Sequence, residues 1–159
     1  MATVPLHWTW ARFDDLGVHA LHEALVLRCR VFVVEQACAY QEVDEADTRA
    51  WHLLGRAAPG GPLLATLRVV DPDGKGAGPS IGRVVIAPQA RGGGTGQALM
   101  REGLARCQTA WPGQDIRISA QAHLQRFYGA LGFVAVSQAY VEDGIPHVDM
   151  LWRWPGAGR

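Results

Sequence analysis

A run of glycines has the composition of a phosphate-binding loop. The residues Arg91-Gly92-Gly93-Gly94-Thr95-Gly96-Gln97 follow the apolar segment 81–86 and precede a helical pattern over 98–111. Glycine permits positive φ and lets a phosphate approach the backbone, and the first amides of a helix have no intrahelical partner. Arg91 adds a planar guanidinium that can bind a phosphate through two hydrogen bonds. The loop predicts a pyrophosphate site at the positive end of a helix dipole, with a flexible surface turn as the alternative.

Two other nucleotide-binding loops do not fit these residues. No Lys-Ser or Lys-Thr pair follows the glycines, so the loop lacks the groups that bind a nucleoside triphosphate and its Mg²⁺. The dinucleotide-binding fingerprint is also incomplete, because Gln97 stands where its third glycine belongs. The sequence therefore favours a pyrophosphate ligand of another kind.

Composition narrows the class of protein. The chain has 159 residues, 48% of them hydrophobic, and a formal net charge of zero. This length predicts one domain over 1–159, and the absence of a basic stripe argues against a nucleic-acid partner. Three widely spaced cysteines without a CxxC pair predict neither a disulfide framework nor a metal site. We expect no metal.

The location of the protein is also an expectation from sequence. Residues Met1 to Leu6 lack the basic head and apolar core of a secretion signal. No apolar run approaches the ~18 residues of a membrane span, so we expect no membrane partner. A cytoplasmic protein follows from these features together.

Hydrophobic periodicity predicts an α/β fold in which one mixed sheet has helices on its faces. Helices are expected from Asp14 or Asp15 to Phe32, over 98–111 and over 124–131, with Gly132 at the C′ position. Strands are expected at 7–13, 51–56, 63–70, 81–86, 116–119, 134–140 and 147–154. The glycine loop opens at the carboxyl end of one strand, where such sheets tend to bind ligands.

Two motifs together resemble the GNAT superfamily of N-acetyltransferases. Residues 91–96 match its acetyl-CoA motif, Arg/Gln-x-x-Gly-x-Gly/Ala, and residues 127–133 match Phe-Tyr-x-x-x-Gly-Phe. Longer strings are similar to the ElaA-like subgroup. They are Arg30-Val31-Phe32-Val33-Val34-Glu35-Gln36, Tyr40-Gln41-Glu42 with Asp44, Gly82-Arg83-Val84-Val85, Ser119-Ala120-Gln121-Ala122-His123-Leu124-Gln125 and Glu142-Asp143-Gly144-Ile145-Pro146-His147. The resemblance implies a mostly antiparallel sheet whose strands splay apart at an acetyl-CoA site.

The resemblance also implies roles for single residues. Tyr128 would give a proton to the departing thiolate of CoA, and a backbone N–H near Ile86 would stabilise the oxyanion. On spacing alone, Tyr128 is instead a core residue. Many members of the superfamily carry Asn where this chain has Gln121, so the contact of Gln121 with the cofactor is open. The residues implied to bind acetyl-CoA are Val84, Val85, Ile86, Arg91, Gly92, Gly93, Gly94, Thr95, Gly96, Gln97 and Gln121.

The acceptor side of the site is less defined by sequence. The expected substrate-binding residues are Glu35, Gln36, Tyr40, Ser119 and His147. The candidates for a general base are His147, His52, His123, Glu35 and Glu42. The carboxylates Glu42, Asp44, Glu45 and Asp47 could attract a cationic amine, but a charge-rich loop is usually a solvated surface.

The sequence leaves three hypotheses for function. The first is transfer of an acetyl group from acetyl-CoA to a primary amine of a small molecule or peptide, by direct attack. The second is an acyltransferase like the acyl-homoserine-lactone synthases, to which the Arg30-Val31-Phe32 pattern is similar. The third is a non-catalytic sensor of acyl-CoA. The strands ending at Trp152 and Trp154 offer an apolar surface for a homodimer.

Overall fold

The structure is a computed structural model that describes residues 5–75 and 77–156, so the expectation for Met1 to Leu6 falls mostly outside the described residues. One sheet has the strand order β1-β2-β3-β4-β5-β8-β6, with β7 paired to β8. Among the strands of the described residues, only β4 and β5 pair in parallel. The strands are β1 (His7–Arg12), β2 (Ala50–Arg56), β3 (Leu63–Val70), β4 (Ser80–Ile86), β5 (Ile116–Gln121), β6 (Phe133–Ala135), β7 (Tyr140–Glu142) and β8 (Ile145–Trp152). The predicted mixed, mostly antiparallel sheet is confirmed.

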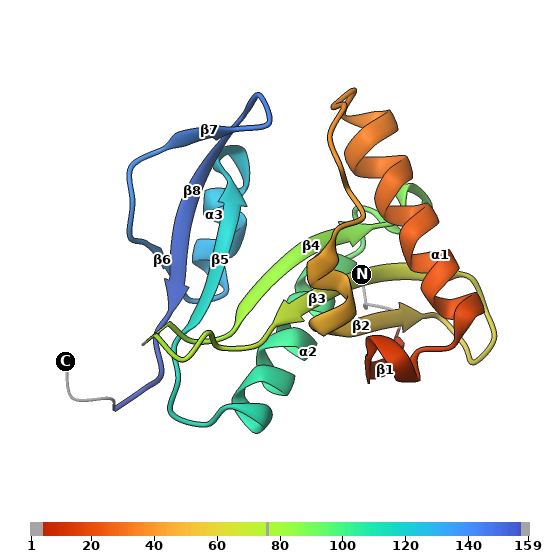
Figure 1. Ribbon diagram of the computed structural model, residues 1–159, viewed down its shortest axis with the longest axis horizontal. Coiled ribbons are helices and arrows are strands. Elements are labelled where there is room, and N and C mark those ends of the chain that lie inside the picture. The colour runs from red at the N-terminus through yellow and green to blue at the C-terminus, as the bar shows by residue number, and fades with distance from the viewer. Residues whose placement is uncertain (1–4, 76, 157–159) are drawn as a thin grey trace.

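Helices cover both faces of the sheet (Figure 1). One face carries α1 and the π-helix η2, and the other carries α2 and α3. The helices are η1 (Phe13–Asp15), α1 (Val18–Arg28), η2 (Cys29–Glu35), η3 (Glu45–Arg49), η4 (Pro88–Ala90), α2 (Thr95–Ala110), η5 (Ala122–Leu124) and α3 (Gln125–Ala130). No helix in the described part of the chain is long and apolar enough to span a membrane.

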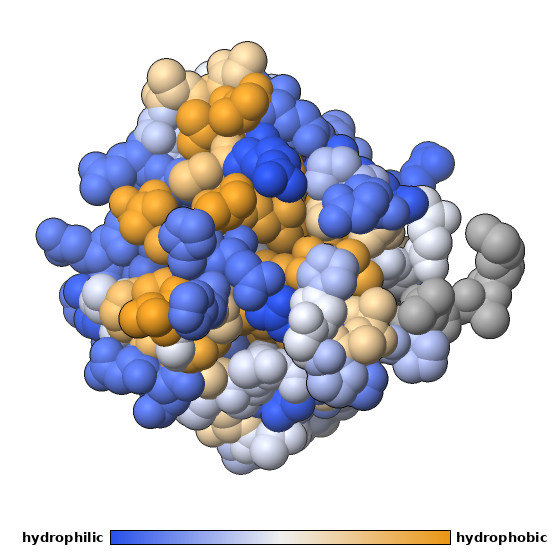
Figure 2. Space-filling view, turned by 90° about the vertical axis from the view of Figure 1, so that its right-hand side faces the viewer, coloured by the Kyte–Doolittle hydropathy of each residue, from blue (hydrophilic) through white to orange (hydrophobic). Residues whose placement is uncertain are grey.

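The alternation of side chains along β3 produces two cores. Leu67 and Val69 point to the core under α2, whereas Arg68, between them, points to the α1 side and binds carboxylates there. The outer surface on the α1 side mixes hydrophobic patches with hydrophilic ones (Figure 2). The exposed valines of α1 and η2 are Val18, Val26 and Val34.

The first predicted helix changes type in its second half. The chain is α-helical only to Arg28, and Cys29–Glu35 form a π-helix. Its wider turns continue in the bonds Gln36 N–H to Val31 O and Cys38 N–H to Val33 O, each 3.0 Å and each spanning five residues. π-Turns are rare and are frequent at functional sites.

The carboxyl-terminal half differs from the prediction in three places. The expected strand 134–140 is wrong, because residues 136–139 separate β6 from β7. β7 and β8 instead form a two-residue hairpin at Asp143 and Gly144, whose positive φ values of 51° and 76° suit a type I′ turn. β8 therefore begins at Ile145 and ends at Trp152. The expected helix 124–131 is a 3₁₀ turn followed by α3, and Gly132 ends it with φ 102°.

Candidate acyl-transfer site

The sheet opens between β4 and β5. Their parallel pairing consists of Ser80 opposite Arg117 and Ile81 opposite Ile118, after which the strands diverge (Figure 1). A cavity of about 910 Å³ lies there, walled by η2, β4, the glycine loop, β5, α3 and the β7–β8 turn. Its volume lies in the range of small-molecule sites, about 300–1,000 Å³.

The glycine loop forms one end of this cavity. Gly92 and Gly94 have φ values of 84° and 82°, which only glycine adopts without strain. Regular hydrogen bonding in α2 begins with Ala98 N–H to Gly94 O at 3.0 Å. The amides of Thr95, Gly96 and Gln97 consequently have no intrahelical acceptor and lie at the positive end of a 16-residue helix. This is the geometry of an anion site.

Arg91 lies beside the loop but binds a carboxylate of the protein. Its guanidinium donates to both oxygens of Glu35, at 2.7 and 3.2 Å, and both side chains are about two-fifths exposed. The ion pair joins η2 to the glycine loop. The structure thus brings together one residue expected at the cofactor and one expected at the acceptor.

Beyond Ile81, the edge of β4 that faces the cleft pairs with no strand of the described residues. Val85 lies opposite Thr66 of β3, and Ala87 N–H donates to Leu64 O at 2.8 Å. Because backbone groups alternate in direction along a strand, those of Val84 and Ile86 point to the cleft and those of Val85 to β3. Val84 and Ile86 can therefore pair with an added extended ligand, whereas the backbone of Val85 is engaged.

A bulge lies in β4 where the strands separate. The register between β3 and β4 shifts between Thr66 and Arg68, and Arg83 has a φ of 49°, which is uncommon for a residue with a side chain. The bulge turns the backbone of Arg83 and Val84 at the mouth of the cleft. Arg83 is a cavity residue that the spacing of side chains gave no reason to select.

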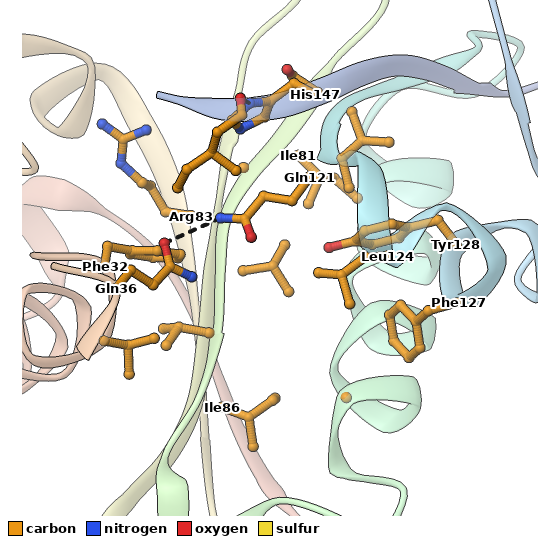
Figure 3. Close-up of a pocket in the computed structure, with 18 of the residues that line it drawn as sticks. Phe32, Gln36, Ile81, Arg83, Ile86, Gln121, Leu124, Phe127, Tyr128 and His147 are labelled. Atoms are coloured by element: carbon orange, nitrogen blue, oxygen red, sulfur yellow. Dashed lines mark hydrogen bonds between the residues drawn. The ribbon is translucent and has the colours of Figure 1, made fainter. Parts of the chain in front are cut away.

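Tyr128 enters the cavity from α3. Its hydroxyl points inward, next to Leu124 and above Phe127 (Figure 3). The residue is 5% exposed, and burial raises the pKa of its phenol to about 12. Tyr128 is both a core residue, in edge contact with Phe133 at 5.9 Å between ring centroids, and a hydroxyl directed at the cleft. The two interpretations from sequence are therefore compatible.

The rest of the cavity wall is built from η2 on one side and from β5 and β8 on the other. The amide of Gln121 donates to the side-chain oxygen of Gln36 at 3.3 Å, across the cleft (Figure 3). Cys38 Sγ donates to Asp143 O at 3.3 Å and links the segment after η2 to the β7–β8 turn. The expected substrate residues Glu35, Gln36, Tyr40, Ser119 and His147 all line this one cavity.

The carboxylate-rich loop is not a solvated surface, and that expectation is wrong for its central residues. Glu42 and Asp47 are 3% and 2% exposed. Arg28 donates to Glu42 and to Asp47, each at 2.7 Å, and Arg68 donates to Asp47 at 2.9 Å. Burial raises the pKa of Asp47, but the hydrogen bonds and charges of both arginines outweigh it and hold that pKa below its usual value.

The same cluster reaches the cavity through its outer members. Arg83 donates to Glu42 at 2.9 Å and to Asp44 at 3.3 Å, and Arg68 donates to Asp44 at 2.6 Å. Tyr40 donates a short hydrogen bond to Glu42. Three arginines thus face three carboxylates, and Glu42 is bound by too many donors to act as an available base.

The candidate histidines occupy different environments. His52 is 2% exposed, and its Nε2 donates to Asp47 O at 2.9 Å. Burial lowers its pKa, and it is a structural residue outside the cavity wall. His147 and His123 line the cavity, and His147 Nδ1 lies 2.7 Å from Ile145 O. No group of three or more metal-ligating side chains occurs among residues 5–75 and 77–156.

Comparisons with known proteins agree with this geometry. Residues 30–154 match the family model described as an acetyltransferase (GNAT) domain. A UPF0039 protein from Synechocystis is 40% identical over 153 residues, 96% of this chain and 99% of that protein. An acyl-CoA N-acyltransferase from Pseudomonas aeruginosa has a TM-score of 0.85 and 45% identity, covering 92% of this chain and 99% of its own.

The subgroup is supported by the same kind of evidence. ElaA from Escherichia coli is 40% identical over 147 residues, 91% of this chain and 95% of that protein. Its crystal structure has a TM-score of 0.85 and covers 92% of this chain and 99% of its own. The resemblance stated from the two motifs is confirmed. The chain belongs to the GNAT family of acetyltransferases, among the proteins similar to ElaA.

Proposed function

We propose that this protein transfers the acetyl group of acetyl-CoA to a primary amine by direct attack, without an acetyl-enzyme intermediate. One arrangement carries the proposal. The free amides of α2, the open edge of β4 and the hydroxyl of Tyr128 all border a single cavity. These are the contacts that a diphosphate, an extended amide-containing arm and a departing thiolate require, in that order.

In this proposal each group has one task. The amides of Thr95, Gly96 and Gln97 hold the pyrophosphate, and Val84 and Ile86 bind the pantetheine arm as an added strand. A backbone N–H at the cleft edge of β4 stabilises the oxyanion, and loss of such a donor typically costs about 3–4 kcal/mol in the barrier. Arg91 must leave Glu35 to reach a phosphate.

Tyr128 donates its proton to the thiolate. Because its pKa is raised to about 12 by burial, the phenol is fully protonated at neutral pH. Burial makes it a weaker acid than a phenol in water. The thiolate leaves into the same apolar surroundings, which raise the proton affinity of the sulfur as well.

The acceptor is a small molecule or a peptide with an unhindered amine. The wall opposite Tyr128 offers polar side chains of several kinds, among them Gln36, Tyr40, Ser119 and His147. The name of the Pseudomonas relative, an acyl-CoA N-acyltransferase, supports acyl-CoA as the donor and nitrogen as the accepting atom.

The test has two parts. Calorimetric titration with CoA measures binding, and free-thiol release with acetyl-CoA and a panel of primary amines measures transfer, with the acetylated amine identified by mass. Transfer from an acyl-carrier protein and not from CoA would favour the synthase hypothesis. Tight CoA binding without thiol release for any amine would favour the sensor.

We further infer a cytoplasmic enzyme that pairs as a homodimer and binds no nucleic acid. The odd number and wide spacing of Cys29, Cys38 and Cys107 suit a reducing compartment. Trp152 and Trp154 are partly exposed near the outer strands, with ring centroids 6.3 Å apart. Sedimentation analysis of the wild type and of Trp154→Ser tests the dimer.

A further inference from the structure

A chain of hydrogen bonds connects the cavity to the surface beside the acceptor wall. Ser119 Oγ lies 2.5 Å from the hydroxyl of Tyr140, and that hydroxyl donates to Asp149 Oδ1 at 2.6 Å. Ser119 and Asp149 lie opposite each other on β5 and β8, and Tyr140 comes from β7. Ser119 lines the cavity, and Ser119 and Asp149, at the two ends of the chain, are both exposed residues.

Counting hydrogens gives this chain a direction. A carboxylate has no hydrogen to donate, so the single hydroxyl hydrogen of Tyr140 lies on the bond to Asp149. The hydroxyl of Ser119 must then be the donor to the oxygen of Tyr140. Both lone pairs of Ser119 Oγ are left to accept a hydrogen from a group in the cavity. All hydrogens of the chain point outward, away from the reacting centre.

The chain lies on the side of the sheet that faces away from Tyr128. Ile118 and Ala120, the neighbours of Ser119 along β5, point into the core that contains Tyr128. Ser119 therefore points to the other face, where Gln121 contacts Gln36 after η2. An amine bound on that face and a thiolate bound near α3 would meet these two hydroxyls from opposite sides of the cleft.

We propose that Ser119, Tyr140 and Asp149 carry away the proton that the amine loses during transfer. This rests on the proposed function. As the C–N bond forms, the C=O electron pair moves to oxygen, and the nitrogen becomes strongly acidic. Its proton passes to Ser119 Oγ, the Ser119 proton passes to Tyr140, and the Tyr140 proton passes to Asp149. The C–S bond then breaks, Tyr128 protonates the sulfur, and exchange with water restores Asp149 and Tyr128.

The charged groups around the chain suit this direction of transfer. His147 stacks on Tyr140 with 6.1 Å between ring centroids, and Glu142 lies 3.9 Å from His147 Nε2. Arg117 is two residues from Ser119 on the same face of β5 and is exposed. Partial burial, the bond to Asp149 and the charge of Glu142 raise the pKa of Tyr140. The phenol therefore stays neutral and can both accept and donate a proton. In this arrangement Ser119 is the catalytic residue, and Tyr140 and Asp149 act through it as positioning residues.

The experiment compares Ser119→Ala, Tyr140→Phe and Asp149→Asn with the wild type, using acetyl-CoA and four probe amines: putrescine, tyramine, phenethylamine and glycinamide. Ser137→Ala is the control, because its hydroxyl accepts from the backbone N–H of Asp149 at 2.9 Å but does not touch the carboxylate. Each test variant should lower kcat/KM about 100-fold at pH 7, the lower end for general acid–base catalysis. The double variant Tyr140→Phe with Asp149→Asn should be no slower than either single variant.

Two readouts separate this role from a structural one. The deficit should shrink as pH rises, because hydroxide from the solvent increasingly takes the proton of the tetrahedral intermediate in place of Ser119. In mixtures of H₂O and D₂O, the wild-type rate should vary non-linearly with the deuterium fraction, as expected when several protons move in one step. In Ser119→Ala this dependence should become linear. Wild-type turnover with the three variants within threefold of it would overturn the proton route and leave the proposed function intact.

A measurement without turnover keeps the two proposals distinct. The ionisation of ¹³C-labelled Tyr140, followed by NMR, should move to lower pH in Asp149→Asn, since the carboxylate charge that opposes it is gone. Identical titrations would show that the chain is not formed, and would overturn the proton route. Absence of acetyl transfer to any amine by the wild type would instead contradict the proposed function.

Discussion

At the scale of single residues, burial decides what a side chain in this site can do. Tyr128 is held by its packing in α3, so its hydroxyl has one position, and the same burial keeps it protonated. Glu42 is equally buried, but two arginines bind one of its oxygens and Tyr40 binds the other, which leaves it a structural anion. A buried carboxylate next to the cavity is therefore no general base when its oxygens are already bound.

Tyr128→Phe tests the acid. The variant should bind CoA with wild-type affinity, because only the hydroxyl is removed, and it should lose about 100-fold or more in kcat at pH 7. The deficit should become smaller toward pH 9, where the CoA thiolate, with a thiol pKa near 8.5, leaves without a proton. Pre-steady-state thiol release measures the loss of rate, and calorimetry measures the affinity for CoA. Wild-type kcat in this variant would remove Tyr128 from the mechanism.

The residues that sequence selected are those carried by a motif. Tyr128 and Ser119 belong to strings similar to the family, and the structure places both at the cavity. Tyr140 and Asp149 were not selected, because their contact depends on the register of β7 and β8 across a two-residue turn. The spacing of residues 119, 140 and 149 in the sequence does not predict that their hydroxyl and carboxyl groups meet. The three groups come together because β8 pairs with both β5 and β7.

At the scale of elements, the glycine loop works by backbone geometry. Gly92 and Gly94 need positive φ, whereas the φ of Gly93 is not positive, and a Cβ added there would meet no atom of the described residues within 4 Å. The three glycines therefore have two different reasons to be glycine. The outer two shape the turn, and close approach of the diphosphate is the reason that we propose for the middle one.

Gly93→Ala tests whether the middle glycine is needed for contact with the ligand. It should leave the free energy of unfolding unchanged and weaken CoA binding at least tenfold, since a methyl group holds the diphosphate away from the amides. Gly113→Ala is the matched control: its φ of 83° makes the change strained by about 1 kcal/mol, far from the loop and without effect on CoA affinity. Chemical denaturation measures the stability of both variants, and calorimetry measures their affinity for CoA. Unchanged CoA affinity in Gly93→Ala would contradict the pyrophosphate site.

The type of an element could be predicted where its hydrophobic periodicity extends over many residues. The prediction failed where a few residues interrupt that periodicity. Strands β1 to β4 and helix α2 follow their patterns closely. The π-helix was missed because its apolar residues keep an α-like spacing, and only the five-residue hydrogen bonds reveal it. The tight turn at Asp143 and Gly144 carried the Asp-Gly signature of a hairpin, yet the strands beside it were placed too far apart.

At the scale of the whole molecule, the buried charges connect the site to the rest of the fold. Arg28 belongs to α1, Asp47 to η3, Arg68 to β3 and Arg83 to the bulge of β4. The cluster holds the α1 side against the sheet at the edge of the cavity. Sequence alone suggested a solvated acidic loop, because the arginines that neutralise it are 14 to 41 residues away along the chain.

Asp47→Asn tests how much the fold depends on this cluster. Removing the charge of Asp47 leaves three arginines facing two carboxylates, Glu42 and Asp44, so one buried positive charge is uncompensated and the free energy of unfolding should fall by about 3–5 kcal/mol. Glu102→Gln is the control, because its pair with Arg106 is a partly exposed i,i+4 pair worth about 0.3–0.5 kcal/mol. Urea unfolding at pH 7.5 measures both. Equal, small losses in the two variants would show that the cluster contributes no more than a surface pair.

The same cluster predicts how stability depends on pH. Burial lowers the pKa of His52 below the ordinary value near 6.5, so the folded state binds fewer protons than the unfolded state as pH falls through that value. Its contribution is complete above pH 6.5 and is lost toward the lower folded pKa. Hydrogen bonds from Arg68 lower the pKa of Asp44, and the arginines outweigh burial at Asp47, so a second loss follows only below about pH 4. In His52→Gln, urea midpoints should lose their decline between pH 7.5 and 5 and keep the decline below pH 4. If the urea midpoint of the variant still falls between pH 7.5 and 5 as it does in the wild type, a group other than His52 causes that fall.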